Sequence, residues 1–110
     1  TKLSVEAGRT LKEASEILVS SITIWEIALK VKQQKLAIPI SPGDYASEIA
    51  RISRVKIVSV DTQNWLENVR LDWDHRDPAD RTVVALANLS DSLLVTSDRK
   101  ILDFCSRAVW

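Results

Sequence analysis

The sequence predicts an α/β fold with a mainly parallel sheet, and three observations favour it. Helical and strand-like patterns alternate along the chain, as in folds built from right-handed strand–helix–strand crossovers. The strand-like runs are short and continuously apolar, which is typical of strands buried on both faces of a parallel sheet. A chain of 110 residues, 45% of them apolar, is long enough for one core. We therefore expect a single domain over residues 1–110.

The first half of the chain contains a buried strand between two predicted helices, followed by a third predicted helix. Apolar residues recur at near-helical spacing over about 5–15, and the apolar run 17–19 predicts a strand. The helix predicted over 22–32 carries apolar residues on most of its sides. A loop follows over 33–42, and the Ser41-Pro42 pair is typical of a helix start. The next helix should therefore begin there.

The second half repeats the alternation. Residues 55–60 alternate and are β-branched, which predicts a strand, and Asp61 is placed to cap a short helix. A polar loop over 71–77 precedes a helix that opens at Asp77 and continues to about Leu89. The remaining predicted elements are a strand over 93–96, a helical turn from Asp98 and a terminal strand over 108–110.

The composition excludes several classes of protein. Fifteen basic and fifteen acidic residues leave a net charge of zero, so no global field attracts nucleic acid or anionic lipid. No apolar stretch approaches the length of a membrane-spanning helix. The one cysteine, Cys105, excludes an intrachain disulfide and a cysteine-based zinc site, and should be a buried, unreactive thiol. A reducing cytoplasm fits this cysteine content best.

Carboxylates follow the predicted strands and crossovers in order. They are Glu26, Asp61, Asp77, Asp80 and Asp98. The carboxyl ends of parallel strands meet at one edge of a sheet, where carboxylates that converge repel one another unless a cation lies among them. Hard oxygen ligands without a Cys or His cluster favour Mg²⁺ or Mn²⁺ over zinc.

Each of these carboxylates also has a purely structural interpretation. Glu26 and Lys30 have the i, i+4 spacing of a solvated helical pair, and spacing alone favours that interpretation. Asp77 precedes a proline as helix-capping residues do, and Asp61 and Asp98 can cap the helices after them. The pattern alone leaves these alternatives open.

Three segments in register resemble the PIN-domain ribonucleases, specifically the VapC-like toxins of bacterial type II toxin-antitoxin pairs. They are SSITIWEIA at 20–28, HRDPADR at 75–81 and LVTSD at 94–98. The resemblance implies a three-layer α/β/α sandwich with a mainly parallel sheet. It assigns the catalytic, metal-binding carboxylates to Glu26, Asp80 and Asp98, and gives Asp61 no role.

The resemblance also implies an activity and partners. The acidic cluster of such enzymes holds Mg²⁺ or Mn²⁺, which neutralises an RNA phosphodiester and activates water for in-line attack. A cognate antitoxin protein and a homodimer are expected, with no membrane partner. Residues expected to orient carboxylates or water are Thr96, Ser20 and Asp77, with helix capping as the alternative. Possible RNA contacts are Lys30, Lys32, Arg81 and Arg99, whereas His75 is expected to be a surface loop residue.

One part of the family pattern is missing. The family begins with a strand that ends in a Leu-Asp-Thr type segment, and nothing before Leu3 supplies its aspartate. We therefore expect the chain to be truncated at its amino end, without the first strand, and its activity to be doubtful. One alternative is a catalytically inactive PIN-fold module that binds antitoxin. A more remote one is a phosphorelay receiver domain, which Asp61 and Thr96 would fit.

Overall fold

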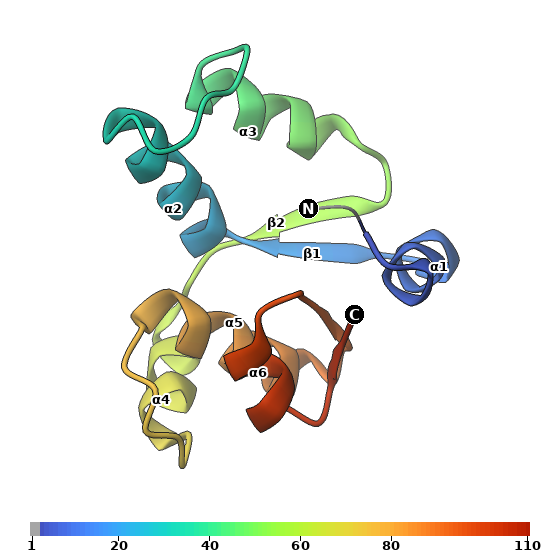
Figure 1. Ribbon diagram of the computed structural model, residues 1–110, viewed down its shortest axis with the longest axis vertical. Coiled ribbons are helices and arrows are strands. Elements are labelled where there is room, and N and C mark those ends of the chain that lie inside the picture. The colour runs from blue at the N-terminus through green and yellow to red at the C-terminus, as the bar shows by residue number, and fades with distance from the viewer. Residues whose placement is uncertain (1–2) are drawn as a thin grey trace. The chain divides into compact units, whose positions relative to one another are not determined.

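The fold is a mixed α/β arrangement with parallel strands, which confirms the predicted class (Figure 1). The structure, a computed structural model, describes residues 3–110. The chain divides into two compact units. Unit 1 comprises residues up to 14 together with 61–110, and unit 2 comprises 15–60.

Unit 2 is a parallel strand pair with two helices in the crossover. Its elements are β1 (Ile17–Ser20), α2 (Ser21–Lys32), α3 (Pro42–Arg51) and β2 (Val55–Val58). In the strand register, Ile17 lies opposite Val55 and Ser20 opposite Val58. The Ser21 hydroxyl accepts a hydrogen bond from the Val60 amide at 3.1 Å. That bond ties the segment after β2 to the start of α2.

Unit 1 contains four helices and a second parallel strand pair. Its elements are α1 (Val5–Glu13), α4 (Thr62–Arg70), α5 (Pro78–Ser90), β3 (Leu94–Val95), α6 (Arg99–Phe104) and β4 (Ala108–Val109). Strand β3 pairs with β4, and α1 packs against β3. The longest of these helices, α5, packs chiefly against α4. This α4–α5 pair positions the candidate site described below.

The apolar core of unit 1 lies between α5 and α6. Val84, Ile101 and Cys105 are buried together, with Trp73 and Phe104 packed against them. Cys105 is 6% exposed, which confirms the prediction of a buried thiol. Because Trp73 belongs to the loop before α5, this packing attaches that loop to the core.

A small buried polar network joins α4 to α5. Asn64 and Asn68 are buried, and Thr82 is completely inaccessible to solvent. The Asn68 side-chain amide donates to the Thr82 hydroxyl at 2.9 Å, and that hydroxyl donates to the Pro78 carbonyl at 2.6 Å. The Asn64 amide donates to the Thr82 carbonyl at 3.2 Å. Buried polar groups that are fully bonded in this way fix the register of the two helices.

The structure differs from the sequence-based prediction in one respect of the sheet. We expected one mainly parallel sheet, whereas the described strands form two separate parallel pairs, β1–β2 and β3–β4. Strands β3 and β4 are only two residues long, so each offers few backbone groups for further pairing. Among the described residues, no helix is long and apolar enough to cross a membrane.

The buried network generates a stability prediction. Thr82→Val removes the hydroxyl that bonds both Asn68 and Pro78, and should lower the free energy of unfolding by about 1 to 3 kcal/mol, because buried polar groups lose their partners. Urea denaturation measures this change. The control is Thr62→Val at the exposed start of α4, which should stay within about 0.5 kcal/mol of the unmodified chain. Equal effects of the two substitutions would contradict a stabilising network.

Candidate functional site

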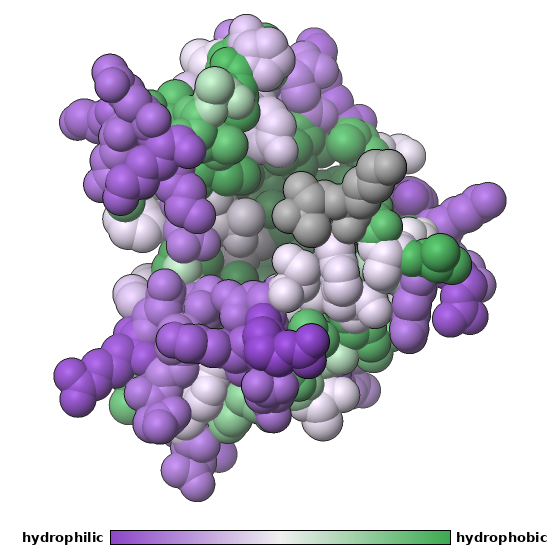
Figure 2. All heavy atoms as spheres, in the orientation of Figure 1, coloured by the Kyte–Doolittle hydropathy of each residue, from purple (hydrophilic) through white to green (hydrophobic). Residues whose placement is uncertain are grey.

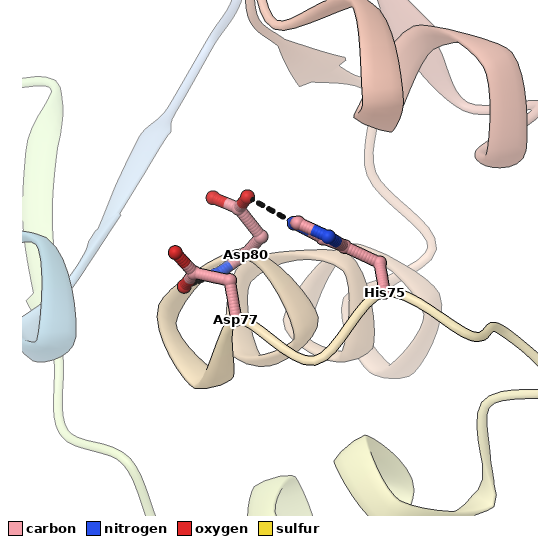
Figure 3. A group of neighbouring side chains, drawn as sticks. All are labelled: His75, Asp77 and Asp80. Atoms are coloured by element: carbon pink, nitrogen blue, oxygen red, sulfur yellow. Dashed lines mark hydrogen bonds and ion pairs between the residues drawn. The ribbon is translucent and has the colours of Figure 1, made fainter.

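Three side chains that could bind a metal ion converge at the start of α5. His75, Asp77 and Asp80 each offer one ligand atom, and these atoms lie within 4.8 Å of one another. Figure 3 shows the His75 ring pointing toward the Asp80 carboxylate, with Asp77 at the first turn of the same helix. Among residues 3–110, no other group of three or more His, Cys, Asp or Glu side chains has its ligand atoms this close together.

Asp77 caps α5, as its position before a proline predicted. Its Oδ1 accepts hydrogen bonds from the amides of Ala79 at 2.9 Å and Asp80 at 3.1 Å. Pro78 occupies the first helical position, where a missing N–H costs nothing. The capping bonds hold the Asp77 carboxylate beside Asp80, in the first turn, where the helix dipole favours negative charge.

His75 is a site residue that the sequence analysis missed. Its Nε2 lies 2.7 Å from Asp80 Oδ2, and the two side chains are only 16% and 22% exposed. His75 lies in a loop as expected, but its side chain is mostly shielded, so the expected surface position is wrong. The imidazole packs against the Trp73 ring with 4.8 Å between centroids, which shields it from solvent. The available signal was that Asp77 and Asp80 follow His75 within five residues, but without a helical or strand period this spacing had no structural interpretation.

Asp98 caps α6 from the end of the β3 segment. Its Oδ1 accepts from the Lys100 amide at 2.9 Å, and its own amide donates to the Thr96 hydroxyl at 3.0 Å. Asp98 therefore caps α6, which is the alternative that the sequence left open. Thr96 bonds the backbone of the carboxylate residue that we expected it to orient. Asp98 is not part of the group formed by His75, Asp77 and Asp80.

The three aspartates share a feature of their hydrogen bonding. In each, the chain holds one carboxylate oxygen: Oδ1 of Asp77, Oδ2 of Asp80 and Oδ1 of Asp98. In the part of the chain that the structure describes, the other oxygen makes no hydrogen bond or ion pair. Each carboxylate is therefore oriented by the fold through one oxygen, and the chain leaves its other oxygen unbonded.

The donor set fits a divalent cation. Carboxylate oxygens suit Mg²⁺ and Mn²⁺, whereas an imidazole nitrogen suits Fe, Ni, Cu and Zn. Asp77 and Asp80 bring two negative charges close together in a partly shielded place, so a cation there would relieve their repulsion. The side chains of this group are therefore compatible with the expected Mg²⁺ or Mn²⁺.

The remaining predicted ligand lies in unit 2. Glu26 is half-buried on α2, whereas Asp80 and Asp98 belong to unit 1. Its role as a ligand stays a prediction. Ser20 is 4% exposed, and its hydroxyl accepts from the Ile22 amide at 3.2 Å, so it caps α2. This is the alternative that the sequence analysis left open for Ser20.

Comparison with known protein families identifies the chain. The PIN domain family matches residues 2–106. The chain belongs to the PIN domain family. No curated protein and no solved structure gives a significant match. The PIN domain is a nuclease-type fold whose members are generally metal-dependent RNases. The family match does not favour the receiver-domain alternative. A VapC-like toxin identity and a truncated amino end stay predictions.

Three of the four predicted RNA contacts in this PIN domain are surface residues. Lys30 and Lys32 are exposed in the last turn of α2. The Arg99 side chain is 80% exposed and lies 3.8 Å from Asp103. Nothing in these positions prevents contact with RNA, and their roles stay predictions.

Arg81, the fourth, has a structural role in the PIN domain. Its guanidinium donates to backbone carbonyls of α4 and of the loop before α5, and to one side-chain oxygen of α4. The acceptors are Trp73 O at 2.6 Å, His75 O at 2.9 Å, Asn68 O at 2.7 Å, Leu71 O at 3.0 Å and Asn68 Oδ1 at 3.3 Å. An arginine has five N–H donors, so these contacts occupy all of them. They argue against the predicted RNA contact, because no donor is left for a phosphate.

The contacts of Arg81 predict a large effect of a conservative substitution. Arg81→Lys should lower the free energy of unfolding by about 2 to 4 kcal/mol, because one ammonium cannot reach carbonyls spread along the loop. Thermal unfolding followed by circular dichroism measures the change. Arg70→Lys is the matched control, since the Arg70 side chain is 79% exposed and pairs with Glu67 on the helix surface. Similar melting temperatures for the two variants would contradict the role of Arg81.

Proposed function

We propose that this PIN domain is a metal-dependent endoribonuclease that hydrolyses RNA phosphodiester bonds, and that it is the toxin of a toxin-antitoxin pair. The family match over residues 2–106 supports nuclease chemistry. The observation that carries the proposal is the convergence of Asp80 with His75 and Asp77 at the start of α5. Asp80 is also the residue to which the resemblance to VapC-like toxins assigns a metal ligand, the aspartate before the arginine of the 75–81 segment, so resemblance and geometry support the same residue.

Each residue of the proposed site has a specific role. Asp80 and Asp98 would offer the cation their oxygens that the chain does not bond, and Glu26 would complete the set. A divalent cation, when bound, supplies positive charge that stabilises the phosphodiester and activates the attacking water. His75 holds Asp80 Oδ2, which fixes the direction of the other oxygen. Asp77 holds the start of α5 and thereby the position of Asp80.

The proposal predicts which substitutions abolish activity. Glu26→Gln, Asp80→Asn and Asp98→Asn should each lower Mg²⁺- or Mn²⁺-dependent cleavage of single-stranded RNA by about 100-fold or more, because losing a ligand should cost at least as much as losing a group that supports one. Cleavage of a fluorescent oligoribonucleotide measures the rate, and calorimetry with Mn²⁺ measures metal binding. EDTA should abolish cleavage by the unmodified chain.

Two features of these variants separate metal binding from folding. Asparagine caps helices as well as aspartate does, so Asp98→Asn keeps the capping bond of α6 while removing the charge. Asp44→Asn is the matched control for Asp80→Asn, since Asp44 lies in the first turn of another helix, α3. Full activity of Asp80→Asn would refute the assignment. An unmodified chain that cleaves no RNA with either metal but binds an antitoxin would favour the inactive antitoxin-binding module.

The proposal includes a cytoplasmic homodimer that an antitoxin inhibits. Apolar side chains reach the visible surface among hydrophilic ones in Figure 2. Trp25 is 56% exposed and Trp65 is 45% exposed, and exposed tryptophans are frequent anchors of protein interfaces. We expect an antitoxin to cover the acidic residues or to insert a cationic side chain among Glu26, Asp80 and Asp98 in place of the metal.

Association can be measured directly. Light scattering at micromolar concentration should give twice the mass of one chain, and Trp25→Ser or Trp65→Ser should shift the equilibrium toward monomer, because an interface anchor is lost. Leu89→Ser, at a side chain 41% exposed on α5, serves as a control for the loss of exposed apolar surface. A monomer at all concentrations would refute the dimer. An antitoxin complex with the nuclease activity and metal affinity of the free chain would refute inhibition at the site.

A further inference from the structure

A cavity of about 560 Å³ lies beside the candidate metal site, within unit 1. Its walls come from the loop before α5 and from α6, and include Trp73, His75 and Phe104 together with the charged residues Asp74, Arg76 and Lys100. His75 belongs both to this cavity and to the group with Asp77 and Asp80. A ligand in the cavity would therefore lie next to the proposed catalytic residues.

The rings in the cavity wall form an aromatic stack. Trp73 and Phe104 are nearly parallel, with 6° between their planes and 4.5 Å between centroids. The His75 ring is tilted by 50° against Trp73. All three rings line the cavity, and aromatic side chains are the groups that contact unstacked nucleobases in single-stranded RNA, with little preference for one base. The size also suits one nucleotide, since small-ligand cavities measure about 300 to 1,000 Å³.

The charges around the cavity suit a nucleotide as well. In the part of the chain that the structure describes, Arg76 and Lys100 make no ion pair, so both can contact phosphate. Asp103, also in the wall, lies 3.8 Å from Arg99, which offsets its charge. The carboxylate of Asp74, which also lines the cavity, can accept a hydrogen bond from an amino or imino group of a base.

We propose that this cavity is a subsite for one nucleotide of single-stranded RNA, next to the phosphodiester that is cleaved. The base lies against the wall of Trp73, His75 and Phe104, and its phosphate contacts Arg76 and Lys100. This inference rests on the proposed ribonuclease function for its substrate. Nucleotide binding in the cavity does not itself require cleavage, so it can be tested separately.

The first experiment detects the nucleotide without catalysis. The full chain in EDTA is titrated with 5′-nucleoside monophosphates, and with ribose 5-phosphate as a ligand of the same charge without a base. Nuclear magnetic resonance follows the indole N–H signals, and Trp73→Phe assigns that of Trp73. Nucleotides should shift the Trp73 signal and leave those of Trp25 and Trp65 in place, with ribose 5-phosphate binding about tenfold more weakly. Equal binding of ribose 5-phosphate would indicate a phosphate site only and overturn the proposal.

The second experiment removes the cations with a matched control. Arg76→Gln/Lys100→Gln should weaken nucleotide binding about tenfold, and both side chains are exposed, so folding should not depend on them. Arg9→Gln/Lys12→Gln makes the same change of charge on the exposed face of α1 and should leave binding unchanged. Equal affinities of the two double variants would overturn the proposal. Weaker binding of a protein partner with unchanged nucleotide binding would assign the cavity to that partner and also overturn it.

Kinetics distinguish failure of the subsite from failure of the proposed function. Arg76→Gln/Lys100→Gln should raise KM for RNA about tenfold with little change in kcat, because the variant keeps the metal-binding carboxylates. If the unmodified chain cleaves RNA and this KM equals that of the control, the subsite is wrong and the ribonuclease stands. If nucleotides shift Trp73 as expected but no RNA is cleaved with Mg²⁺ or Mn²⁺, the subsite stands and the ribonuclease is wrong.

Discussion

The candidate site depends on the hydrogen bonds that the guanidinium of Arg81 donates to the loop before α5. Arg81 lies in the first turn of α5 and binds backbone carbonyls of the preceding segment, including those of Trp73 and His75. A loop without regular structure cannot pair its own carbonyls, and leaving them unpaired in a partly buried place is costly. One side chain satisfies them here. The loop conformation that carries His75 is therefore set by the same helical turn that carries Asp80.

The two ends of that turn act together. Asp77 bonds the amides at the start of α5, while Arg81 bonds carbonyls of the loop that precedes it, so donors and acceptors are both satisfied around one helix start. Stacking of Trp73 on Phe104 then attaches the loop to α6. The positions of the acidic group and of the neighbouring cavity thus follow from the same few contacts, which explains why the two share His75.

Sequence patterns predicted the parts of the structure that depend on local chemistry. The caps at Asp61, Asp77 and Asp98 follow from side-chain hydrogen bonds within three residues, and the structure contains all three. Contacts made outside regular elements were not predictable in this way. The contact between His75 and Asp80 depends on the path of the loop, and Arg81 was interpreted from its charge, whereas its contacts depend on which carbonyls the loop turns toward it. Pairing of the strands into two separate sheets was equally outside the reach of local periodicity.

The two oxygens of one carboxylate can have different partners, so helix capping is compatible with metal binding. Helix capping and catalysis are alternative interpretations of an aspartate only when both of its oxygens are needed for one task. In Asp77, Asp80 and Asp98 the chain bonds one oxygen each, and this bond restricts the rotation of the group before any ligand arrives. A cation that binds the second oxygen then meets a side chain that is already oriented, so less conformational entropy is lost on binding. An aspartate can therefore cap a helix and still offer an oriented oxygen, so a cap observed in the structure does not count against a metal ligand.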